Sequence, residues 1–243
     1  MFVKSTVKYI QSLSHKKQRD ADRVFIAEGP KLVEELLSGN SVVPKEIFAT
    51  SEWAAIHSKY KEIISVIDDH SLARISSLVT PNQVLAIFNQ PVFQSAFQPG
   101  KEIALILDSI QDPGNLGTII RTADWFGIDH IFCSLETADQ FNPKVVQSTM
   151  GSISRVQVQY TDLPAFIDQY SGEPLFAATL DGRDLPQVKT PTHGFLLVGN
   201  ESKGVSKELL VKASTRIRIP GKGRAESLNA SVATAIILAA WIR

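Results

Sequence analysis

The chain has 243 residues, 44% of them hydrophobic, and its 25 Lys and Arg balance 25 Asp and Glu. This composition supports one large core or two small ones and excludes intrinsic disorder over most of the chain. Without net charge, binding of an acidic polymer must come from local clusters of positive charge, which excludes a histone-like mode. The single cysteine, Cys133, cannot form an intramolecular disulfide and indicates a reducing setting, for which we predict the cytoplasm.

The sequence predicts no membrane anchor. An apolar run must reach about 18 residues to span a bilayer as a helix, and the longest candidate, 230–242, contains Ser231 and Thr234. The first nineteen residues carry five Lys and Arg and no acid, but they lack the continuous apolar core of a secretory signal. Their charge alone leaves an organellar transit peptide open.

The first ninety residues alternate between strand-like and helix-like patterns. A basic amphipathic opening leads to VFIAEG at 24–29, and KLVEELLSGN at 31–40 predicts a helix with its aliphatic residues on one face. We expect a small α/β domain over 1–90. A linker over 91–101 follows, where two prolines and a glycine interrupt any regular period.

After the linker the strands become continuously apolar or β-branched. Such strands have both faces covered by helices, so residues 102–243 are expected to form an α/β domain with a mostly parallel sheet. Strands are predicted at 103–108, 130–133, 154–159, 175–180, 195–199 and 216–220, and helices at 116–126, 143–150, 163–170, 207–213 and in the last seventeen residues.

Three glycine-rich turns follow strands, at 108–127, 199–207 and 219–231. The first lacks the GxGxxG pattern of dinucleotide sites, and the second has the GxxxxG spacing of a P-loop but Val205 in place of the phosphate-binding Lys. Nucleotide hydrolysis is therefore rejected. Each turn lies at the carboxyl end of a predicted parallel strand, where open α/β sheets bind ligands, so we expect the turns to meet.

Polar residues are expected to converge at these turns. The group lacks His, Cys and paired carboxylates, so no metal is expected and the chemistry should depend on positioning. Each residue alone also fits an ordinary role, as a helix cap, a solvated helix residue or a turn acid. Their joint placement at three strand ends favours a site, and the group comprises Asn115, Arg121, Asn200, Glu201, Ser227 and Asn229.

The three turns, taken in order, resemble the signature motifs of the SpoU (TrmH-like) RNA 2′-O-ribose methyltransferases of the SPOUT superfamily. The motifs are NLGTIIRTADWFG at 115–127, LLVGNESKGVS at 196–206 and IPGKGRAESLNASVATAIILA at 219–239. The segment 142–158 is similar to a further family segment, although its STMGS is bulkier than usual. FIAEGPKLVEELL at 25–37 resembles, less specifically, the family's small ribosomal-protein-like substrate-binding domain.

This resemblance implies an S-adenosylmethionine-dependent enzyme with a deep trefoil knot, which acts as a homodimer with its sites near the dimer interface. It also implies which residues hold the methyl donor, namely Thr179, Leu180, Gly199, Ile219 and Leu228.

The resemblance points to Arg121 as the central catalytic residue. Because a guanidinium is almost never deprotonated, we expect Arg121 to clamp the target phosphate and stabilise a developing alkoxide rather than act as a base. Asn115 is expected to orient Arg121 or the ribose, and Glu201 to fix its loop or Arg121. Ser227 and Asn229 are expected to hold the third loop and the target nucleotide.

Two stretches concentrate positive charge. Residues 1–23 carry six Lys or Arg against two Asp, and residues 212–224 carry five with no acid. Such clusters suit phosphate contacts, which we predict at Lys16, Lys17, Arg19, Lys222 and Arg224. The expected substrate is structured RNA, and the added amino-terminal domain favours ribosomal over transfer RNA. The alternatives are a tRNA 2′-O-methyltransferase, a non-catalytic RNA-binding protein on the same fold, and a small-molecule regulator without RNA affinity.

Overall fold

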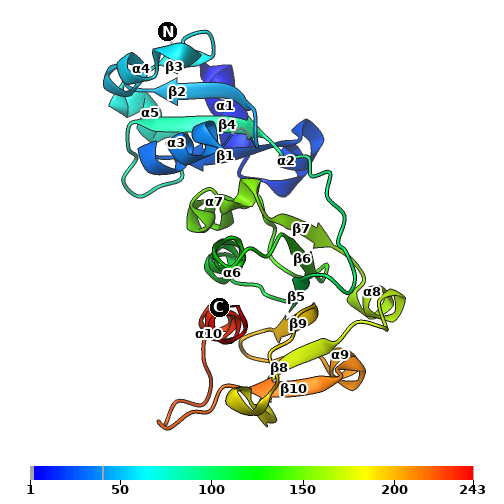
Figure 1. The fold of residues 1–243 in the computed structure, drawn as a ribbon. Coiled ribbons are helices and arrows are strands. Elements are labelled where there is room, and N and C mark those ends of the chain that lie inside the picture. The colour runs from blue at the N-terminus through cyan, green and yellow to red at the C-terminus, as the bar shows by residue number, and fades with distance from the viewer. Residues whose placement is uncertain (1–2, 40, 243) are drawn as a thin grey trace. The chain divides into compact units, whose positions relative to one another are not determined.

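The computed structural model describes residues 3–39 and 41–242, and the chain forms two compact units (Figure 1). Unit 1 contains the chain up to Phe93 together with Asp139–Ser154, and unit 2 contains Gln94–Ala138 and the chain from Arg155 onward. The boundaries expected from the sequence follow chain order. The compact units do not, because 139–154 packs with the first unit.

Unit 1 is built on a four-stranded sheet with the order β1-β4-β2-β3. Its strands are β1 (Val24–Glu28), β2 (Pro44–Ala49), β3 (Ile64–Val66) and β4 (Val84–Asn89). β4 is antiparallel to both neighbours, whereas β2 and β3 are parallel.

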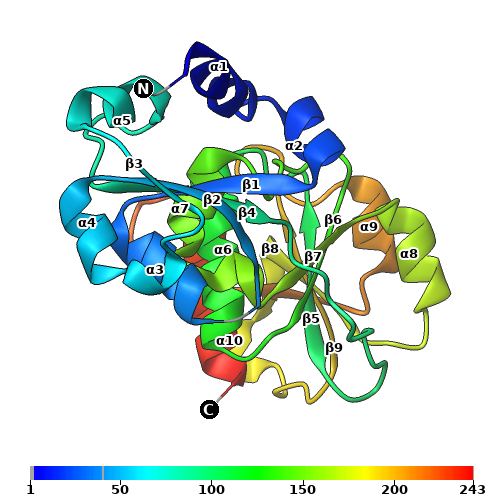
Figure 2. The ribbon, with the colours of Figure 1, turned by 90° about the horizontal axis from the view of Figure 1, so that it is seen from above.

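Helices cover both faces of this sheet (Figure 2). On one face, α1 (Lys4–Ser12) and α5 (Asp69–Ile75) bury aliphatic side chains against alternate residues of β1 and β4. On the other lie α3 (Pro30–Ser38) and α7 (Pro143–Thr149), which both contact β1. The helix predicted at 31–40 is α3, and its four aliphatic residues are buried as expected. Two short helices, α2 (Lys16–Asp22) and α4 (Ser51–Ile56), complete the unit.

The segment 139–154 contributes to the core of unit 1. Phe141 stacks on Phe25 of β1 with ring centroids 5.5 Å apart. Asp139 forms an ion pair with Arg19, whose side chain is 2% exposed. Arg19 also donates to the carbonyls of Leu13 and Ser14, at 2.7 and 2.8 Å. The turn between α1 and α2 is therefore held by a residue pair 120 positions apart in sequence.

Unit 2 contains a six-stranded sheet with the order β10-β8-β9-β5-β6-β7, in which each neighbouring pair is parallel. The expectation of a mostly parallel sheet is confirmed. The strands are β5 (Ile103–Asp108), β6 (His130–Cys133), β7 (Gln157–Tyr160), β8 (Leu175–Asp184), β9 (Gly194–Gly199) and β10 (Thr215–Arg218).

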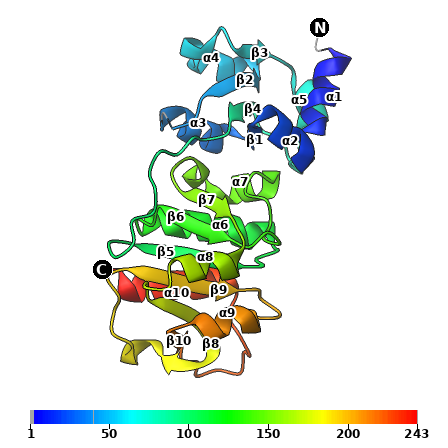
Figure 3. The ribbon, with the colours of Figure 1, turned by 90° about the vertical axis from the view of Figure 1, so that its right-hand side faces the viewer.

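This sheet is covered on both faces (Figure 3). α6 (Pro113–Trp125) and α10 (Ala230–Trp241) pack against each other on one face, and α8 (Leu163–Gln169) and α9 (Lys207–Lys212) on the other. The two-sided cover explains the continuously apolar strands. Burial raises the pKa of the Cys133 thiol on β6, so this side chain stays neutral. Within 3–39 and 41–242, no helix is long and apolar enough to cross a membrane.

The pairing of β8 is interrupted near its middle. β8 pairs with β9 only as far as Ala177. Its pairing with β10 jumps from Ala177 opposite Arg216 to Arg183 opposite Ile217. Residues 178–182 therefore leave the ladder beside the carboxyl end of β9. After β10, residues 219–229 form neither helix nor strand and lead into α10.

Candidate active site

The first turn of α6 presents the side chain of Asn115. The helix begins at Pro113, and the preceding Asp112 caps it by accepting a hydrogen bond from the Asn115 amide at 2.8 Å. Because Asp112 is the cap, the Asn115 side chain bonds elsewhere. Its Nδ2 donates to Oε1 of Glu201 at 2.5 Å, and its Oδ1 accepts from Nδ2 of Asn229 at 2.8 Å.

Asn229 fixes the direction of this chain of hydrogen bonds. Its Oδ1 caps α10 by accepting from the Ser231 amide at 2.9 Å and the Ser231 hydroxyl at 2.6 Å. The Nδ2 of Asn229 is thus left to donate to Asn115, and Asn115 in turn donates to Glu201. The three turns, one from each motif, converge as the sequence predicted.

The loop that carries Glu201 is fixed at both ends. Near its start, Asn200 donates from Nδ2 to the Ser109 carbonyl at 2.9 Å and accepts at Oδ1 from the Ser202 amide at 2.9 Å. Near its end, the Ser206 amide donates to Oδ2 of Asp108 at 2.8 Å. Gly199 is required because the Gly204–Val205 backbone folds back into the space that a Cβ would occupy. Asp108 was not among the predicted site residues, although a polar residue that ends an apolar strand was a signal for it.

Two predicted catalytic residues lie outside this network. Arg121 follows Asn115 by six positions, which at about 100° per residue puts it on another face of α6. It is exposed, and among the described residues it forms no ion pair. Ser227 is also exposed, without a side-chain hydrogen bond to the described part of the chain. The structure thus brings together Asn115, Glu201 and Asn229, but not Arg121 and Ser227.

The residues expected to hold the methyl donor come from the middle of β8, the carboxyl ends of β9 and β10, and the loop before α10. Thr179 and Leu180 are in the interrupted part of β8, Gly199 ends β9, and Ile219 follows β10, while Leu228 precedes α10. The Thr179 hydroxyl is buried with no hydrogen-bond partner among the described residues. Leu180 and Leu228 are 70% and 45% exposed. An unpartnered hydroxyl and exposed aliphatic side chains fit a molecule with both polar and apolar groups.

The basic residues predicted to contact RNA differ in their surroundings. Lys17, Lys222 and Arg224 are exposed, and Lys16 forms a surface ion pair with Asp20 at 2.5 Å. Arg19 contradicts the prediction, because a guanidinium that is 2% exposed and paired with Asp139 is not available to a phosphate. Its role is structural.

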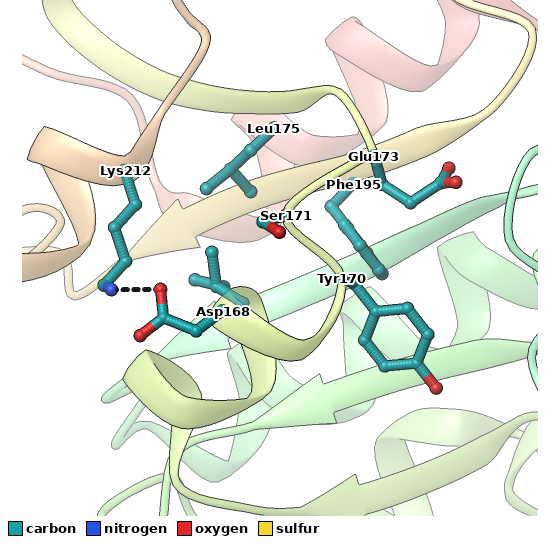
Figure 4. Close-up of a pocket in the computed structure, with 8 residues that line it drawn as sticks. Asp168, Tyr170, Ser171, Glu173, Leu175, Phe195 and Lys212 are labelled. Carbon is teal, nitrogen blue, oxygen red and sulfur yellow. Dashed lines mark hydrogen bonds and ion pairs between the residues drawn. The ribbon is translucent and has the colours of Figure 1, made fainter.

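A cavity of about 210 Å³ lies elsewhere in unit 2 (Figure 4). It is bordered by α8, the starts of β8 and β9, and the end of α9, where Lys212 pairs with Asp168 at 2.5 Å. These are the amino ends of the strands, and none of the lining residues belongs to the three motif turns. The cavity is therefore separate from the candidate active site.

Comparisons with known proteins agree with the motif geometry. The chain matches the SpoU rRNA Methylase family over residues 102–239 and the MRM3-like substrate binding domain over residues 4–86. It is 34% identical over 237 residues to the 23S rRNA (guanosine(2553)-2′-O)-methyltransferase RlmP of Bacillus subtilis, a match that covers 96% of this chain and 94% of RlmP.

Solved structures share the whole fold. An AdoMet-bound rRNA methyltransferase from Sinorhizobium meliloti, 34% identical, aligns with a TM-score of 0.85 over 99% of this chain and 95% of that one. The SpoU methyltransferase AviRb from Streptomyces viridochromogenes, 20% identical, has the same fold with a TM-score of 0.84 over 99% of this chain and 97% of its own. The expected class is confirmed: a mostly parallel α/β sheet of the knotted SPOUT type with a small amino-terminal α/β domain. The chain therefore belongs to the SpoU rRNA methylase family, as shown by its matched domains and its relatives, and the hydrogen bonds that join its three motifs agree with this.

Proposed function

We propose that this chain methylates the ribose 2′-hydroxyl of a nucleotide in ribosomal RNA. As a member of the SpoU family it is an S-adenosylmethionine-dependent RNA 2′-O-methyltransferase. Ribosomal rather than transfer RNA is supported by the similarity to RlmP, which acts on 23S rRNA, and by the MRM3-like substrate binding domain. The observation that carries the proposal is the hydrogen-bonded chain Asn229–Asn115–Glu201, because it joins all three motifs.

The donor-binding residues suit S-adenosylmethionine, which supplies a methyl carbon activated by a sulfonium. The Thr179 hydroxyl, lacking a partner in the described chain, would bond a polar group of the donor. The exposed side chains of Leu180 and Leu228 would cover apolar surface. The backbone near Gly199 and Ile219 completes the proposed site.

The polar residues act by positioning. Alignment of reacting groups can supply roughly 7 to 11 kcal/mol of barrier reduction when the groups are held in the reactive geometry. Asn115 is held on both sides, so its amide is preorganised to orient the ribose. Arg121 clamps the target phosphate and stabilises the developing alkoxide. Glu201 fixes its loop and presents a carboxylate to these groups, and Ser227 holds the target nucleotide.

The active form is proposed to be a homodimer. Val232 and Ile236, one helical turn apart on α10, are 45% and 39% exposed. A second copy that covers this apolar face would also approach α6, which packs against α10 and carries Arg121. Lys16, Lys17, Lys222 and Arg224 are the proposed phosphate contacts, and the proposed setting is the cytoplasm.

The test is methyl transfer from labelled S-adenosylmethionine to ribosomal or transfer RNA, with the modified ribose mapped. We expect 2′-O-methylation of ribosomal RNA. Transfer to tRNA alone would overturn the proposed target, and RNA binding without donor binding in calorimetry would favour a non-catalytic protein.

Arg121→Ala should reduce methyl transfer by about 100-fold or more, because it removes a charge placed for the transition state. The dissociation constant for S-adenosylmethionine should change little. The control is Lys189→Ala, which removes an exposed positive charge of unit 2 outside the three motifs and the two basic stretches. Full turnover by the Arg121 variant would show that its assignment is wrong.

A further inference from the structure

We propose that Asp108 and Asn200 are positioning residues that hold Glu201 against Asn115. The expected effect on methyl transfer rests on the proposed function, whereas the expected effect on the position of Glu201 does not. Neither residue bonds to Asn115 itself. Both connect the end of β5, just before the first motif, to the loop of the second motif.

The connection is reciprocal. Asp108 ends β5, and its Oδ2 accepts from the Ser206 amide on the far side of the loop, at 2.8 Å. Asn200 opens the loop, and its Nδ2 donates back to the carbonyl of Ser109, at 2.9 Å. One strand end therefore supplies a side-chain acceptor and a backbone acceptor, and the loop supplies a donor on each side of Glu201.

The burial of Asp108 makes its bond costly to lose. The residue is 7% exposed, and its Oδ1 is within 3.1 Å of the Ser109 hydroxyl. A buried carboxylate without hydrogen bonds is strongly unfavourable, so the Ser206 amide is held firmly. Val205, next to it, is buried in the core of unit 2, which fixes the same end of the loop a second time.

The start of the loop that carries Glu201 is held by Ser109 and Asn200. Ser109 has a φ of +58°, a left-handed conformation that is unfavourable for a residue with a side chain. Its amide donates to the Ser134 hydroxyl at 3.0 Å, and its carbonyl accepts from Asn200. These bonds compensate for the conformation and direct the carbonyl at the loop. Asn200 also accepts from the Ser202 and Lys203 amides, at 2.9 and 3.1 Å, so its side chain shapes the turn that carries Glu201.

The consequence is a fixed position for the Glu201 carboxylate. Glu201 lies directly after Asn200, and its Oε1 accepts from Asn115 at 2.5 Å. A loop that moved freely would not hold that bond at this length. The role of Asp108 and Asn200 is therefore to make the Asn115–Glu201 contact a property of the folded enzyme before any ligand binds.

The test separates this role from general stability. Asn200→Asp keeps an oxygen for the Ser202 and Lys203 amides but replaces the donor to Ser109 with a repelling carboxylate. Asp108→Asn is a milder variant that keeps one acceptor for Ser206. The matched control is Asp162→Asn, which changes an Asp that accepts one backbone hydrogen bond, from Ala165 at 2.9 Å at the start of α8.

The first readout needs no catalysis. In the full chain without donor or RNA, the side-chain amide signals of Asn115 are identified in an NMR spectrum by their loss in Asn115→Ala. We expect them to shift in Glu201→Gln and in Asn200→Asp by similar amounts, and in Asp108→Asn by less. Asp162→Asn should leave them in place. Unchanged Asn115 signals in a folded Asn200→Asp protein would overturn the inference, whether or not the enzyme methylates RNA.

The second readout is kinetic. Asn200→Asp should lower kcat about 10-fold or more, the equivalent of one charge-assisted hydrogen bond, with little change in KM for S-adenosylmethionine. In a Glu201→Gln background the same substitution should have almost no further effect, because it acts through Glu201. An equal loss in both backgrounds, or a change confined to KM, would contradict the assignment. Shifted NMR signals in a chain that transfers no methyl group would instead refute the proposed function alone.

Discussion

At the scale of single residues, Asn229 has two separable tasks. Its Oδ1 caps α10, and its Nδ2 donates to Asn115 at 2.8 Å. A cap alone would be served equally well by Asp, since a carboxylate accepts from backbone amides and favours the amino end of a helix. The amide is needed only for the contact with Asn115. The choice of Asn at this position therefore reflects the site rather than the helix.

The substitution Asn229→Asp tests this separation. We expect the melting temperature to fall much less than in Asn229→Ala, because the cap is retained. Methyl transfer should fall about 10-fold or more, because a donor is replaced by an acceptor that faces Oδ1 of Asn115. Circular dichroism and a methylation assay are the two measurements. Asn229→Ala, which loses both the cap and the donor, should have a lower melting temperature and a lower rate of methyl transfer. A fully active Asn229→Asp would show that catalysis does not need the contact with Asn115.

At the scale of elements, the first turn of α6 links helix stability to the site. Asp112 caps the helix and Pro113 starts it, so the turn that carries Asn115 is ordered by its neighbours in sequence. Loss of the cap frays that turn first, since helix ends lack intrahelical partners. Asn115 would then lose its fixed position although its own side chain was unchanged.

Asp112→Ala should therefore lower the free energy of unfolding by about 1 kcal/mol and reduce kcat as well. Asp112→Ser, which is also a good cap, should restore both quantities. Urea unfolding and steady-state kinetics provide the measurements. If Asp112→Ser recovers stability but not activity, Asp112 has a chemical role beyond the cap.

At the scale of the whole molecule, unit 1 is assembled from two separate parts of the chain. Asp139 and Phe141 come from the sequence between β6 and β7, yet they pack on Arg19 and Phe25 near the amino terminus. The ion pair between Arg19 and Asp139 is well protected from solvent, with side-chain exposures of 2% and 14%. Removal of one partner leaves a buried charge without compensation.

Asp139→Asn is expected to destabilise unit 1 by about 3 to 5 kcal/mol, because Arg19 would keep its charge in a buried place. The double variant Arg19→Met with Asp139→Leu should recover much of that loss. Urea unfolding is followed by tryptophan fluorescence in a background with Trp125→Phe and Trp241→Phe, so that the signal comes from the buried Trp53 of unit 1. An equal loss in the single and double variants would show that packing, and not the charge, is decisive.

The sequence predicted the features that are local or periodic. Apolar strands with turns at their carboxyl ends led to the parallel sheet and to the meeting of Asn115, Glu201 and Asn229. It did not predict the burial of Arg19, because that residue lies in a basic stretch with the pattern of an exposed surface, and its partner is 120 positions away. The connection from Asp108 to Ser206 was missed for the same reason, since it depends on a loop that closes only in three dimensions.

The two-part construction of unit 1 limits how this enzyme can acquire a new target. A different amino-terminal domain, joined at the linker, would lack partners for Phe141 and Asp139. The Phe141 ring and the Asp139 carboxylate would then be left uncovered. Exchange of the amino-terminal domain therefore requires matched changes in residues 139–154, which belong to unit 1 but lie inside the sequence matched to the methylase family. Divergence by gradual substitution is open to such a protein, whereas a single recombination at the linker is not.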